Sequence, residues 1–459
     1  MAAPRIIIVG AGPAGTRAAE LLVAAGQRPV VVDEAPDNGG QIYRRQPAGF
    51  RRSAQALYGT EAGRATALHA TFDALRGRIE HWPESLAWNV QDGELHVLRD
   101  GHASALPFDA LIIATGATDR LIPLPGWTLP GVFSLGGAQI ALKAQACSIG
   151  QRVAFLGSGP LLYLVAAQYV KAGAEVAAVL DTAPPGARWK ALPLLASRPA
   201  LLAKGAALIG QLMRAGVPIR RGVVPRRVIA GGARVAGITI DGAGGAEEVI
   251  ACDALGMGWH LRAESQLADL AGCGFLFDPD SHQWLPRADE DGCSEVPGVY
   301  LAGDGARILG ADGAEIAGRL AALAVLRDLG LKPPAGADAT ALRRQRTVMD
   351  RFRRGLALAF PWPAHLVRNL PDEVLVCRCE AITAGSLRRS ATELDAPEVN
   401  RAKAFSRVGM GRCQGRFCGV ASAEIVAAAR GVPVQAAGRL RGQAPVKPLP
   451  VTATLEAGE

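Results

Sequence analysis

Four of the eight cysteines form two close pairs in the C-terminal part of the chain. The first pair is Cys377-Arg-Cys379, and the second is Cys413-Gln-Gly-Arg-Phe-Cys418. If the segment between them folds so that the pairs meet, four thiolates surround one small centre. Both a tetrahedral zinc ion and a [2Fe–2S] cluster accept four thiolates. A C-x-C pair is tighter than the spacing usual in zinc fingers, which favours the iron–sulfur cluster.

The residues around these pairs also suit an electron carrier. Backbone amides of nearby glycines can hydrogen-bond the sulfides of a cluster and raise its potential; these are Gly409, Gly411, Gly415 and Gly419. Three arginines would offset the negative charge of a cluster: Arg378, Arg412 and Arg416. The other cysteines are isolated and the chain has no C-x-x-C pair, which argues against disulfide-reductase chemistry.

A second candidate for chemistry is the glycine-rich turn at the start of the chain. Ile6 to Val9 reads as a buried strand, and Gly10, Gly12 and Gly15 follow it. In such a turn the first glycine allows the tight bend, and the second admits a pyrophosphate. The third lets the helix pack against the strand. The helix N-terminus then attracts the anion.

Acidic and basic residues next to this turn extend the expected site. A second strand, residues 29–32, ends in Asp33-Glu34, about twenty residues past the glycines, where an acid suits a ribose hydroxyl and repels a 2′-phosphate. The following loop carries Gln41 and Arg44. It could wrap a pyrophosphate or the edge of a flavin, and it could equally be an ordinary surface loop.

Two later segments complete the pattern. A buried strand at residues 108–114 runs into Thr115-Gly116, and another strand delivers Gly303-Asp304 at its carboxyl end. An aspartate there can accept hydrogen bonds from a ribityl chain, and a helix over residues 314–326 would aim its N-terminus at the flavin pyrimidine. Segments far apart in sequence thus converge on one extended ligand, FAD.

A second strand–glycine–helix unit begins with Gly157 and Gly159, and its next strand ends in Asp181. The third glycine position is Leu162, whose bulk should push the helix from the strand and weaken a nicotinamide site. This unit either binds an adenine nucleotide, ATP or NAD, or is only a remnant of the fold.

Composition places the 459-residue chain among globular proteins of two or three domains: 49% of its residues are hydrophobic and 20% are charged. The net charge of +8 is scattered without an aromatic-interleaved basic stripe, so nucleic acid is not an expected partner. Neither a membrane span nor a signal peptide is apparent. A cytoplasmic location is expected, and there cysteines favour metal or redox chemistry over disulfides.

These patterns predict an α/β flavoprotein with two interleaved Rossmann-like dinucleotide-binding domains, similar to disulfide reductases, and a small C-terminal [2Fe–2S] domain. The FAD-binding domain is expected at 1–118 and 276–330 and the second nucleotide-binding-like domain at 119–275. A linker and helical arm at 331–371 precede the C-terminal domain and tail at 372–459.

The motifs together resemble the FAD-binding alpha (A) subunits of opine oxidases and dehydrogenases, hydroxyproline dehydrogenases and hydrogen-cyanide synthase. The resemblance spans nearly the whole chain, and the segment from Cys377 to Cys418 is its most specific part. It implies that Cys377, Cys379, Cys413 and Cys418 bind iron and that the glycines and acids above bind FAD.

The resemblance further implies a heteromeric amine dehydrogenase in which a D-amino-acid-oxidase-like beta subunit oxidises the substrate. Electrons then reach the FAD and [2Fe–2S] centre of the alpha subunit, through an interface FMN in some relatives, and pass to a quinone or respiratory acceptor. This scheme is compatible with a peripheral position at the inner membrane and with a small third subunit. No catalytic acid, base or nucleophile is identified in this chain. Two alternatives remain open: a self-sufficient NAD(P)H-dependent reductase, and a scaffold whose cofactors only stabilise assembly.

Overall fold

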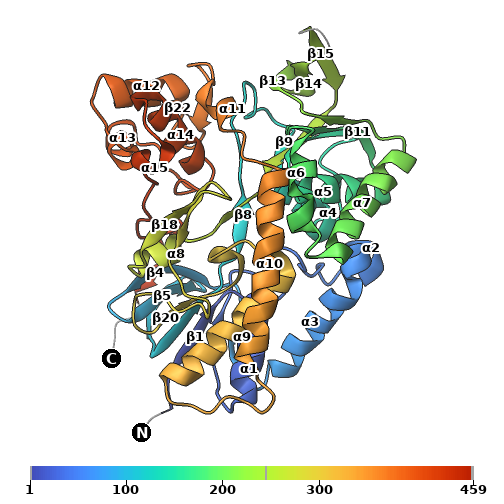
Figure 1. Ribbon diagram of the computed structural model, residues 1–459. Helices are drawn as coiled ribbons and strands as arrows, with labels where there is room; N and C mark the ends of the chain where they lie inside the picture. Colours follow the sequence, from blue (N-terminus) through green and yellow to red (C-terminus); the bar gives the residue numbers. More distant parts are fainter. Residues whose placement is uncertain (1–2, 243–245, 456–459) are drawn as a thin grey trace.

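The computed structural model describes residues 3–242 and 246–455. Two nucleotide-binding-like units lie one above the other in Figure 1, with the long helix α10 (Ala339–Ala359) running beside both and a small C-terminal unit packed at the side. The α/β disulfide-reductase-like architecture predicted from the sequence is confirmed.

The first unit is built on a five-stranded parallel sheet. Its strand order is β20 (Val299–Leu301), β7 (Ala110–Ile113), β1 (Ile6–Val9), β2 (Val30–Val32) and β3 (Glu80–Trp82). Every residue of β1 is buried because both faces of the sheet are covered, as the unbroken apolar run predicts. Strand β20 comes from a distant part of the sequence and completes the sheet next to β7.

Successive side chains of β1 point to opposite faces of this sheet. Ile6 and Ile8 pack against the helices α1 (Pro13–Ala24), α3 (Ala62–Leu75) and α9 (Gly310–Asp328). Ile7 and Val9 pack against a second, four-stranded sheet. That sheet consists of β4 (Leu86–Gln91), β5 (Glu94–Arg99), β6 (His102–Pro107) and β23 (Thr454–Leu455).

The second unit has its own five-stranded parallel sheet. Its order is β12 (Ile219–Arg221), β11 (Glu175–Asp181), β10 (Arg152–Ser158), β16 (Ala254–Trp259) and β9 (Val132–Ser134). One face is covered by α4 (Leu135–Ala144), α5 (Pro160–Lys171) and α7 (Pro199–Arg214). The segment after β11 contains α7 and the shorter α6 (Ala187–Leu195).

The other face of the second sheet is covered by two elements that share one core with it. One is a three-stranded antiparallel sheet: β13 (Pro225–Gly231), β14 (Arg234–Asp241) and β15 (Glu247–Ala251). The other is the C-terminal unit: β21 (Leu375–Cys377), β22 (Ile382–Thr383), α12 (Ala384–Thr392), α13 (Val399–Ser406), α14 (Gly419–Arg430) and α15 (Val434–Ala437). Cys377 and Cys418 belong to this shared core, so the cysteine region is packed onto the flavoprotein.

The chain crosses between the two nucleotide-binding-like units on a two-stranded antiparallel ribbon. Its strands are β8 (Ala117–Asp119) and β17 (Leu261–Ala263), with Ala117 opposite Ala263 and Asp119 opposite Leu261. Strand β8 starts directly after Thr115-Gly116, and β17 starts two residues after the end of β16. This ribbon therefore leads from the carboxyl ends of both parallel sheets.

The remaining elements are short or lie at the periphery. They are α2 (Ala54–Tyr58), α8 (Gln266–Leu270), β18 (Phe275–Asp278), β19 (Gln283–Pro286) and α11 (Ala364–Arg368), with single 3-10 turns at Gly59–Glu61 and Gly303–Gly305. None of the helices in the described ranges is both long and apolar enough to cross a membrane.

Candidate cofactor sites

The first glycine turn has the close packing that a dinucleotide turn requires. Gly10 adopts a φ of +105°, and its amide donates to the carbonyl of Val32 at 2.8 Å. A Cβ on Gly15 would lie 1.8 Å from the carbonyl oxygen of Gly10, so no larger residue fits there. The Gly39-Gly40 loop packs over the turn, since the Gly39 amide donates to the Ala11 carbonyl at 2.9 Å.

The two adjacent acids after β2 lie in different surroundings. The Asp33 carboxylate accepts the Ala11 amide at 2.5 Å and the Ala35 amide at 2.7 Å, and burial raises the pKa of this carboxyl. Glu34 instead forms an ion pair with Lys447 of the C-terminal tail. The structure therefore places Asp33, and not Glu34, against the glycine turn.

Gln41 and Arg44 lie on the loop that covers the turn. An Arg44 guanidinium nitrogen donates to Gln41 Oε1 at 3.0 Å, while the buried Arg44 Nε has no hydrogen-bond partner. The Arg44 charge also favours the ionised form of Asp33. A buried guanidinium N–H without a partner next to a helix N-terminus is suited to an anionic group such as a pyrophosphate.

The two later segments meet each other at the end of the same sheet. A Cβ on Gly305 would lie 2.8 Å from Thr115 Oγ1, and one on Gly303 would lie 2.9 Å from the Cβ of Ala14. Asp304 accepts the amides of Leu309 and Gly310 at 2.8 and 3.0 Å, at the start of α9. Burial raises the pKa of Asp304 to about 6. The predicted FAD residues from Gly10 to Asp304 thus gather at the carboxyl ends of β1, β2, β7 and β20, where ligands bind in open α/β sheets.

The second glycine turn is filled by the chain itself. A Cβ on Gly157 would lie 1.8 Å from the Gly258 carbonyl oxygen, and one on Gly159 would lie 3.1 Å from His260 Nδ1. Asp181 is fully buried, accepts the Tyr163 hydroxyl at 2.6 Å and is ion-paired with Arg188. Leu162 is also fully buried in the core of this unit. The His260 imidazole therefore lies where a nucleotide would approach Gly159, and the Asp181 carboxylate already has hydrogen-bond partners.

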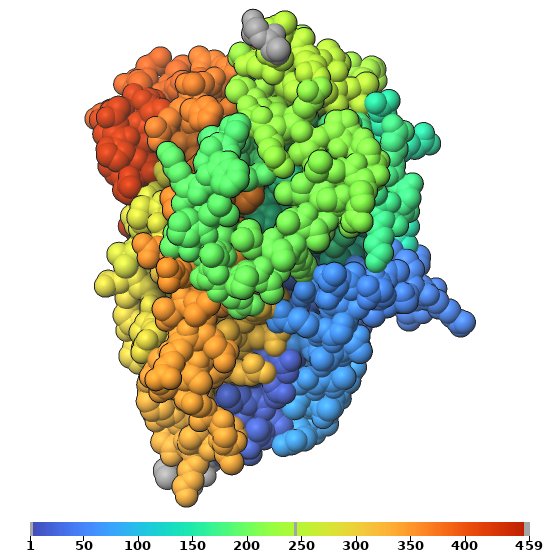
Figure 2. All heavy atoms as spheres, turned by 45° about the vertical axis from the view of Figure 1, so that its right-hand side comes forward, coloured from blue at the N-terminus to red at the C-terminus, as the bar shows by residue number. Residues whose placement is uncertain are grey.

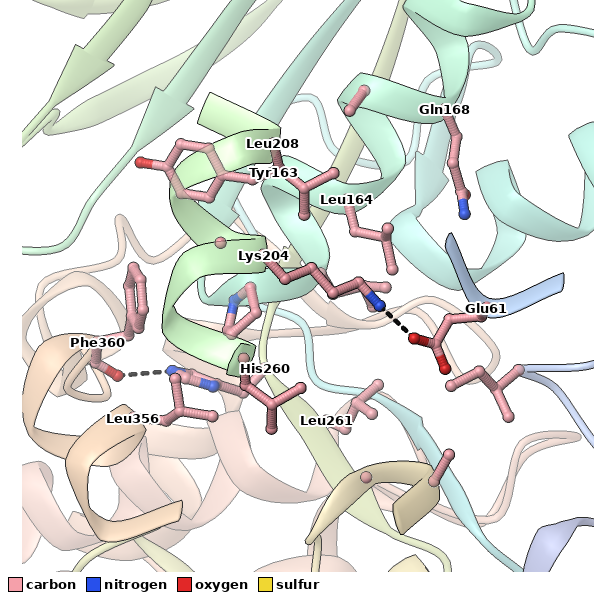
Figure 3. A pocket seen from close by; sticks show the side chains of 18 of the residues that line it. Glu61, Tyr163, Leu164, Gln168, Lys204, Leu208, His260, Leu261, Leu356 and Phe360 are labelled. Atoms are coloured by element: carbon pink, nitrogen blue, oxygen red, sulfur yellow. Dashed lines mark hydrogen bonds and ion pairs between the residues drawn. The ribbon is translucent and has the colours of Figure 1, made fainter. Parts of the chain in front are cut away.

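His260 connects this turn to the helical arm. It adopts a φ of +62°, which is unusual for a residue other than glycine. Its Nε2 lies 2.6 Å from the Phe360 carbonyl, a contact drawn in Figure 3, and burial lowers the pKa of its imidazole to about 4. The ring is therefore neutral at pH 7, with Nε2 donating to Phe360 and Nδ1 left as an acceptor toward Gly159.

A cavity of about 1580 Å³ lies between the two nucleotide-binding-like units. Figure 2 shows the face on which α6 and α7 (green) stand over the α2–α3 region (blue), with an opening between the green parts of the surface. Inside it, Lys204 and Glu61 reach toward each other and pair at 2.6 Å, as Figure 3 shows. Leu164, Leu208 and Leu356 line the walls, so the cavity is largely apolar.

The four C-terminal cysteines come together as their spacing predicts. The Cys418 thiol hydrogen-bonds to Cys377 and Cys413, and Cys379 hydrogen-bonds to Cys413. These bonds lower the pKa of Cys377 to about 6 and that of Cys413 to about 5, and they raise the pKa of Cys418 well above its usual value. Burial raises the pKa of Cys379.

Backbone amides also point at these sulfurs. Amides of Gly409 and Glu380 hydrogen-bond to Cys377, and those of Gly415 and Phe417 hydrogen-bond to Cys413. Arg378 stacks on the rings of Trp127 and Phe417, with ring-centre distances of 5.7 and 5.4 Å. No group of three or more His, Cys, Asp or Glu side chains within 3–242 and 246–455 is arranged to hold a single metal ion.

Two charged residues beside the cysteine loop, Arg262 and Glu264, belong to no motif that the sequence shows. Arg416, which the sequence does single out, pairs with Glu264 at 2.8 Å, and Arg262 lies nearby on β17. Glu264 and Arg262 lie more than a hundred residues from the cysteines and belong to no motif. Only the folded chain brings them to the cysteine loop.

Comparison with known proteins agrees with this geometry. A family model described as pyridine nucleotide-disulphide oxidoreductase matches residues 4–322, and a sarcosine oxidase A3 domain model matches residues 376–459. The A-subunit of opine oxidase from Rhizobium meliloti is 37% identical, with 97% of this chain and 86% of that protein covered. The chain belongs to the FAD-binding A-subunit family of opine oxidases. The predicted family is thereby confirmed.

Other relatives support the same membership. The hydrogen cyanide synthase subunit HcnB of Pseudomonas aeruginosa is 32% identical, with 98% of each chain covered. The solved structure of L-proline dehydrogenase from P. horikoshii superimposes with a TM-score of 0.69 over 98% of this chain and 78% of that chain, at 18% identity, which shows a common fold. Members of this family are flavin-dependent oxidoreductase subunits, and membership implies a bound FAD.

Proposed function

We propose that the chain is the electron-transfer alpha subunit of a heteromeric flavin-dependent amine dehydrogenase or oxidase of the opine or D-hydroxyproline type. In this function a D-amino-acid-oxidase-like beta subunit oxidises the amine, and this chain accepts the electrons. Asp33 would hold the ribose of FAD, Arg44 its pyrophosphate and Asp304 its ribityl chain, while the four cysteines would hold a [2Fe–2S] cluster. Bound FAD and cluster would supply the redox chemistry.

One observation carries this proposal: the turn beside the expected flavin and the cysteine loop are joined by a short series of contacts. Thr115 Oγ1 donates to the Glu264 carbonyl at 2.5 Å, and the Glu264 carboxylate pairs with Arg416. Arg416 in turn donates to the Cys413 carbonyl at 3.3 Å. An electron carrier needs its two centres held in fixed relation, and these partly buried contacts tie the two proposed sites together.

The backbone amides around the thiols favour a two-iron cluster over a zinc ion. A structural zinc draws all four sulfurs around one ion, whereas each iron of a [2Fe–2S] cluster takes only two of the four protein thiolates. The four thiols contact one another in a chain, from Cys377 to Cys418, from Cys418 to Cys413 and from Cys413 to Cys379, so all four are available to one small centre. The backbone amides directed at Cys377 and Cys413 match the second-sphere hydrogen bonds typical of cluster sulfurs.

The large cavity suits a connection to the partner subunit. Arg52 and Lys143 line it, and burial lowers the pKa of the Lys143 amine to about 8. Arg52 already donates to the carbonyls of Leu142 and Lys143, and Lys143 donates to that of Ile42, so the phosphate of an interface FMN would exchange for these contacts. The apolar walls would accept an isoalloxazine. The second glycine turn, with His260 beside Gly159 and Asp181 paired with Arg188, gives no comparable support for a bound ATP or NAD.

The test is to co-express a D-amino-acid-oxidase-like subunit with the chain and to purify the complex anaerobically. We expect bound flavin, iron and acid-labile sulfide, and bleaching of the flavin by an opine or D-hydroxyproline only when both subunits are present. Cys413→Ser should lose the iron, whereas Cys147→Ser, at an exposed isolated thiol, should keep it. A complex without iron, or one whose flavin the amine never reduces, contradicts the proposal; the latter result would favour a scaffold.

A further inference from the structure

Arg262 lies between the expected flavin site and the cysteine loop. It is the central residue of β17 and faces Thr118 of β8 across the ribbon, and β8 begins just after Thr115-Gly116. The same ribbon strand leads into Glu264, whose amide donates to the Gly116 carbonyl at 2.9 Å. The backbone around Arg262 is thus fixed to the flavin-side turn.

The side chain of Arg262 points to the other end of this connection. It lines a small cavity of about 70 Å³ together with Gln414, Gly415 and Gly419, which flank Cys413 and Cys418. The side chain is 18% exposed, and its NH1 nitrogen is buried without a hydrogen-bond partner. Buried guanidinium groups normally have their N–H donors satisfied, and the NH1 group of Arg262 is available to an acceptor at the cysteine centre.

Both positively and negatively charged groups surround Arg262. Its NH1 lies 4.0 Å from Glu264 Oε2, and the same carboxylate pairs with Arg416 at 2.8 Å. Burial lowers the pKa of Arg262, whereas Glu264 and the thiolates of Cys418 and Cys413 favour its charged form. Two arginines against one glutamate leave a net positive charge in a buried region beside the cysteines.

We infer that Arg262 sets the reduction potential of the centre held by the four cysteines, and that Glu264 opposes it. The inference rests on the proposed function, because it requires a cluster at these thiols. Reduction of a cluster adds one negative charge, and a buried cation stabilises that charge more than a solvated one would. Arg262 therefore favours the reduced cluster, and the Glu264 carboxylate disfavours it.

Redox titration of the anaerobically purified complex tests this, with the EPR signal of the reduced cluster as the readout. Arg262→Gln should shift the midpoint potential downward, and Arg262→Lys, which keeps the charge, should restore most of it. Glu264→Gln should shift the potential upward. Arg227→Gln, at a side chain that is 63% exposed on β13, is the control and should leave the potential unchanged.

Opposite shifts of the midpoint potential in Arg262→Gln and Glu264→Gln identify an electrostatic effect. A shift caused only by loosened packing would not depend on the sign of the charge that is removed. Equal potentials in wild type and Arg262→Gln, with the cluster intact, overturn the inference and leave the proposed function standing. If Arg262→Gln does not fold, Glu264→Gln decides alone, and an unchanged or lower potential in it overturns the inference. Wild-type complex without iron overturns both.

Discussion

The carboxylate of Asp181 accepts the Tyr163 hydroxyl at 2.6 Å and pairs with Arg188, which reaches it from α6. In a dinucleotide-binding unit, the acid at the end of the second strand accepts the ribose hydroxyls of the nucleotide. Here this acid is fully buried and already engaged by the protein itself. Together with His260 beside Gly159, these contacts leave the second glycine turn without the free acid that a nicotinamide dinucleotide would use.

We therefore expect neither NADH nor NADPH to reduce the flavin of the purified chain. The measurement is the flavin absorbance under anaerobic conditions after addition of either nucleotide, with dithionite added afterwards to show that the flavin is reducible. Rapid bleaching by NADH without any partner subunit would contradict this prediction and support a self-sufficient reductase.

Gly15→Ala should destabilise the first unit and release its FAD. The new methyl group would lie 1.8 Å from the Gly10 carbonyl oxygen, so the helix must move away from the strand. Overpacking of this kind costs about 1–3 kcal/mol. Thermal unfolding and the flavin content after gel filtration measure both effects.

Gly63→Ala is the matched control for this substitution. Gly63 lies on α3 with no atom within 4 Å of a new Cβ, so alanine should add about 0.5–1 kcal/mol of helix stability. Equal flavin retention in Gly15→Ala and Gly63→Ala would show that the third glycine position is not needed for the cofactor.

The sequence predicts the glycine turns and buried strands well because these features depend on neighbouring residues. The run Ile6–Val9 and the φ of Gly10 are local properties, and the structure shows both. The sequence does not show which of the two acids, Asp33 or Glu34, faces the glycine turn. Adjacent residues in extended chain point in opposite directions, and only the tail residue Lys447 reveals which direction Glu34 takes.

The parts of the site that the sequence does not reveal depend on contacts between distant segments. His260 reaches Gly159 because β16 and β10 are neighbours in the sheet. Glu264 meets Arg416 across 152 positions of the chain. No periodicity or spacing encodes such pairs, since they result from the packing of the C-terminal unit on the ribbon.

Asp304→Asn should make the flavin-free protein more stable at neutral pH. The pKa of Asp304 is raised to about 6 in the folded chain, against about 3.9 in an unfolded one. The folded state therefore binds the proton more tightly, and this contribution to stability is complete below about pH 4 and is lost as the pH rises through about 6. Asparagine, which carries no charge to bury, should recover about 1–3 kcal/mol above that range.

Thermal unfolding of flavin-free wild type and Asp304→Asn between pH 4 and 8 measures this difference. The two proteins should unfold alike at the acid end and diverge toward pH 8, while the variant binds FAD more weakly. Asp100→Asn, at a carboxylate that is 84% exposed, should follow wild type throughout. A gap between wild type and Asp304→Asn that does not change with pH would show that the buried charge is not its cause.

Glu424→Ala should loosen the C-terminal unit from the flavoprotein. Glu424 is fully buried on α14, accepts the Arg368 and Trp362 side-chain N–H groups at 3.0 and 3.1 Å, and lies 2.5 Å from His282 Nε2. Its removal leaves the Trp362 N–H, the partly exposed Arg368 guanidinium and His282 without this acceptor, and the loss of such hydrogen bonds costs about 1–3 kcal/mol. We expect faster proteolysis of the arm at 331–371 and a lower unfolding temperature.

Glu393→Ala, at an exposed residue just past α12 of the same unit, should change stability by no more than about 0.5 kcal/mol. His282 lies between β18 and β19 of the flavoprotein and Arg368 ends α11 of the arm, so Glu424 joins three segments that are separate in sequence. If Glu424→Ala and Glu393→Ala are cleaved at the same rate, the shared apolar core alone holds the C-terminal unit in place. Faster cleavage of Glu424→Ala alone would show that this buried carboxylate fixes the cysteine region relative to the flavin-binding unit.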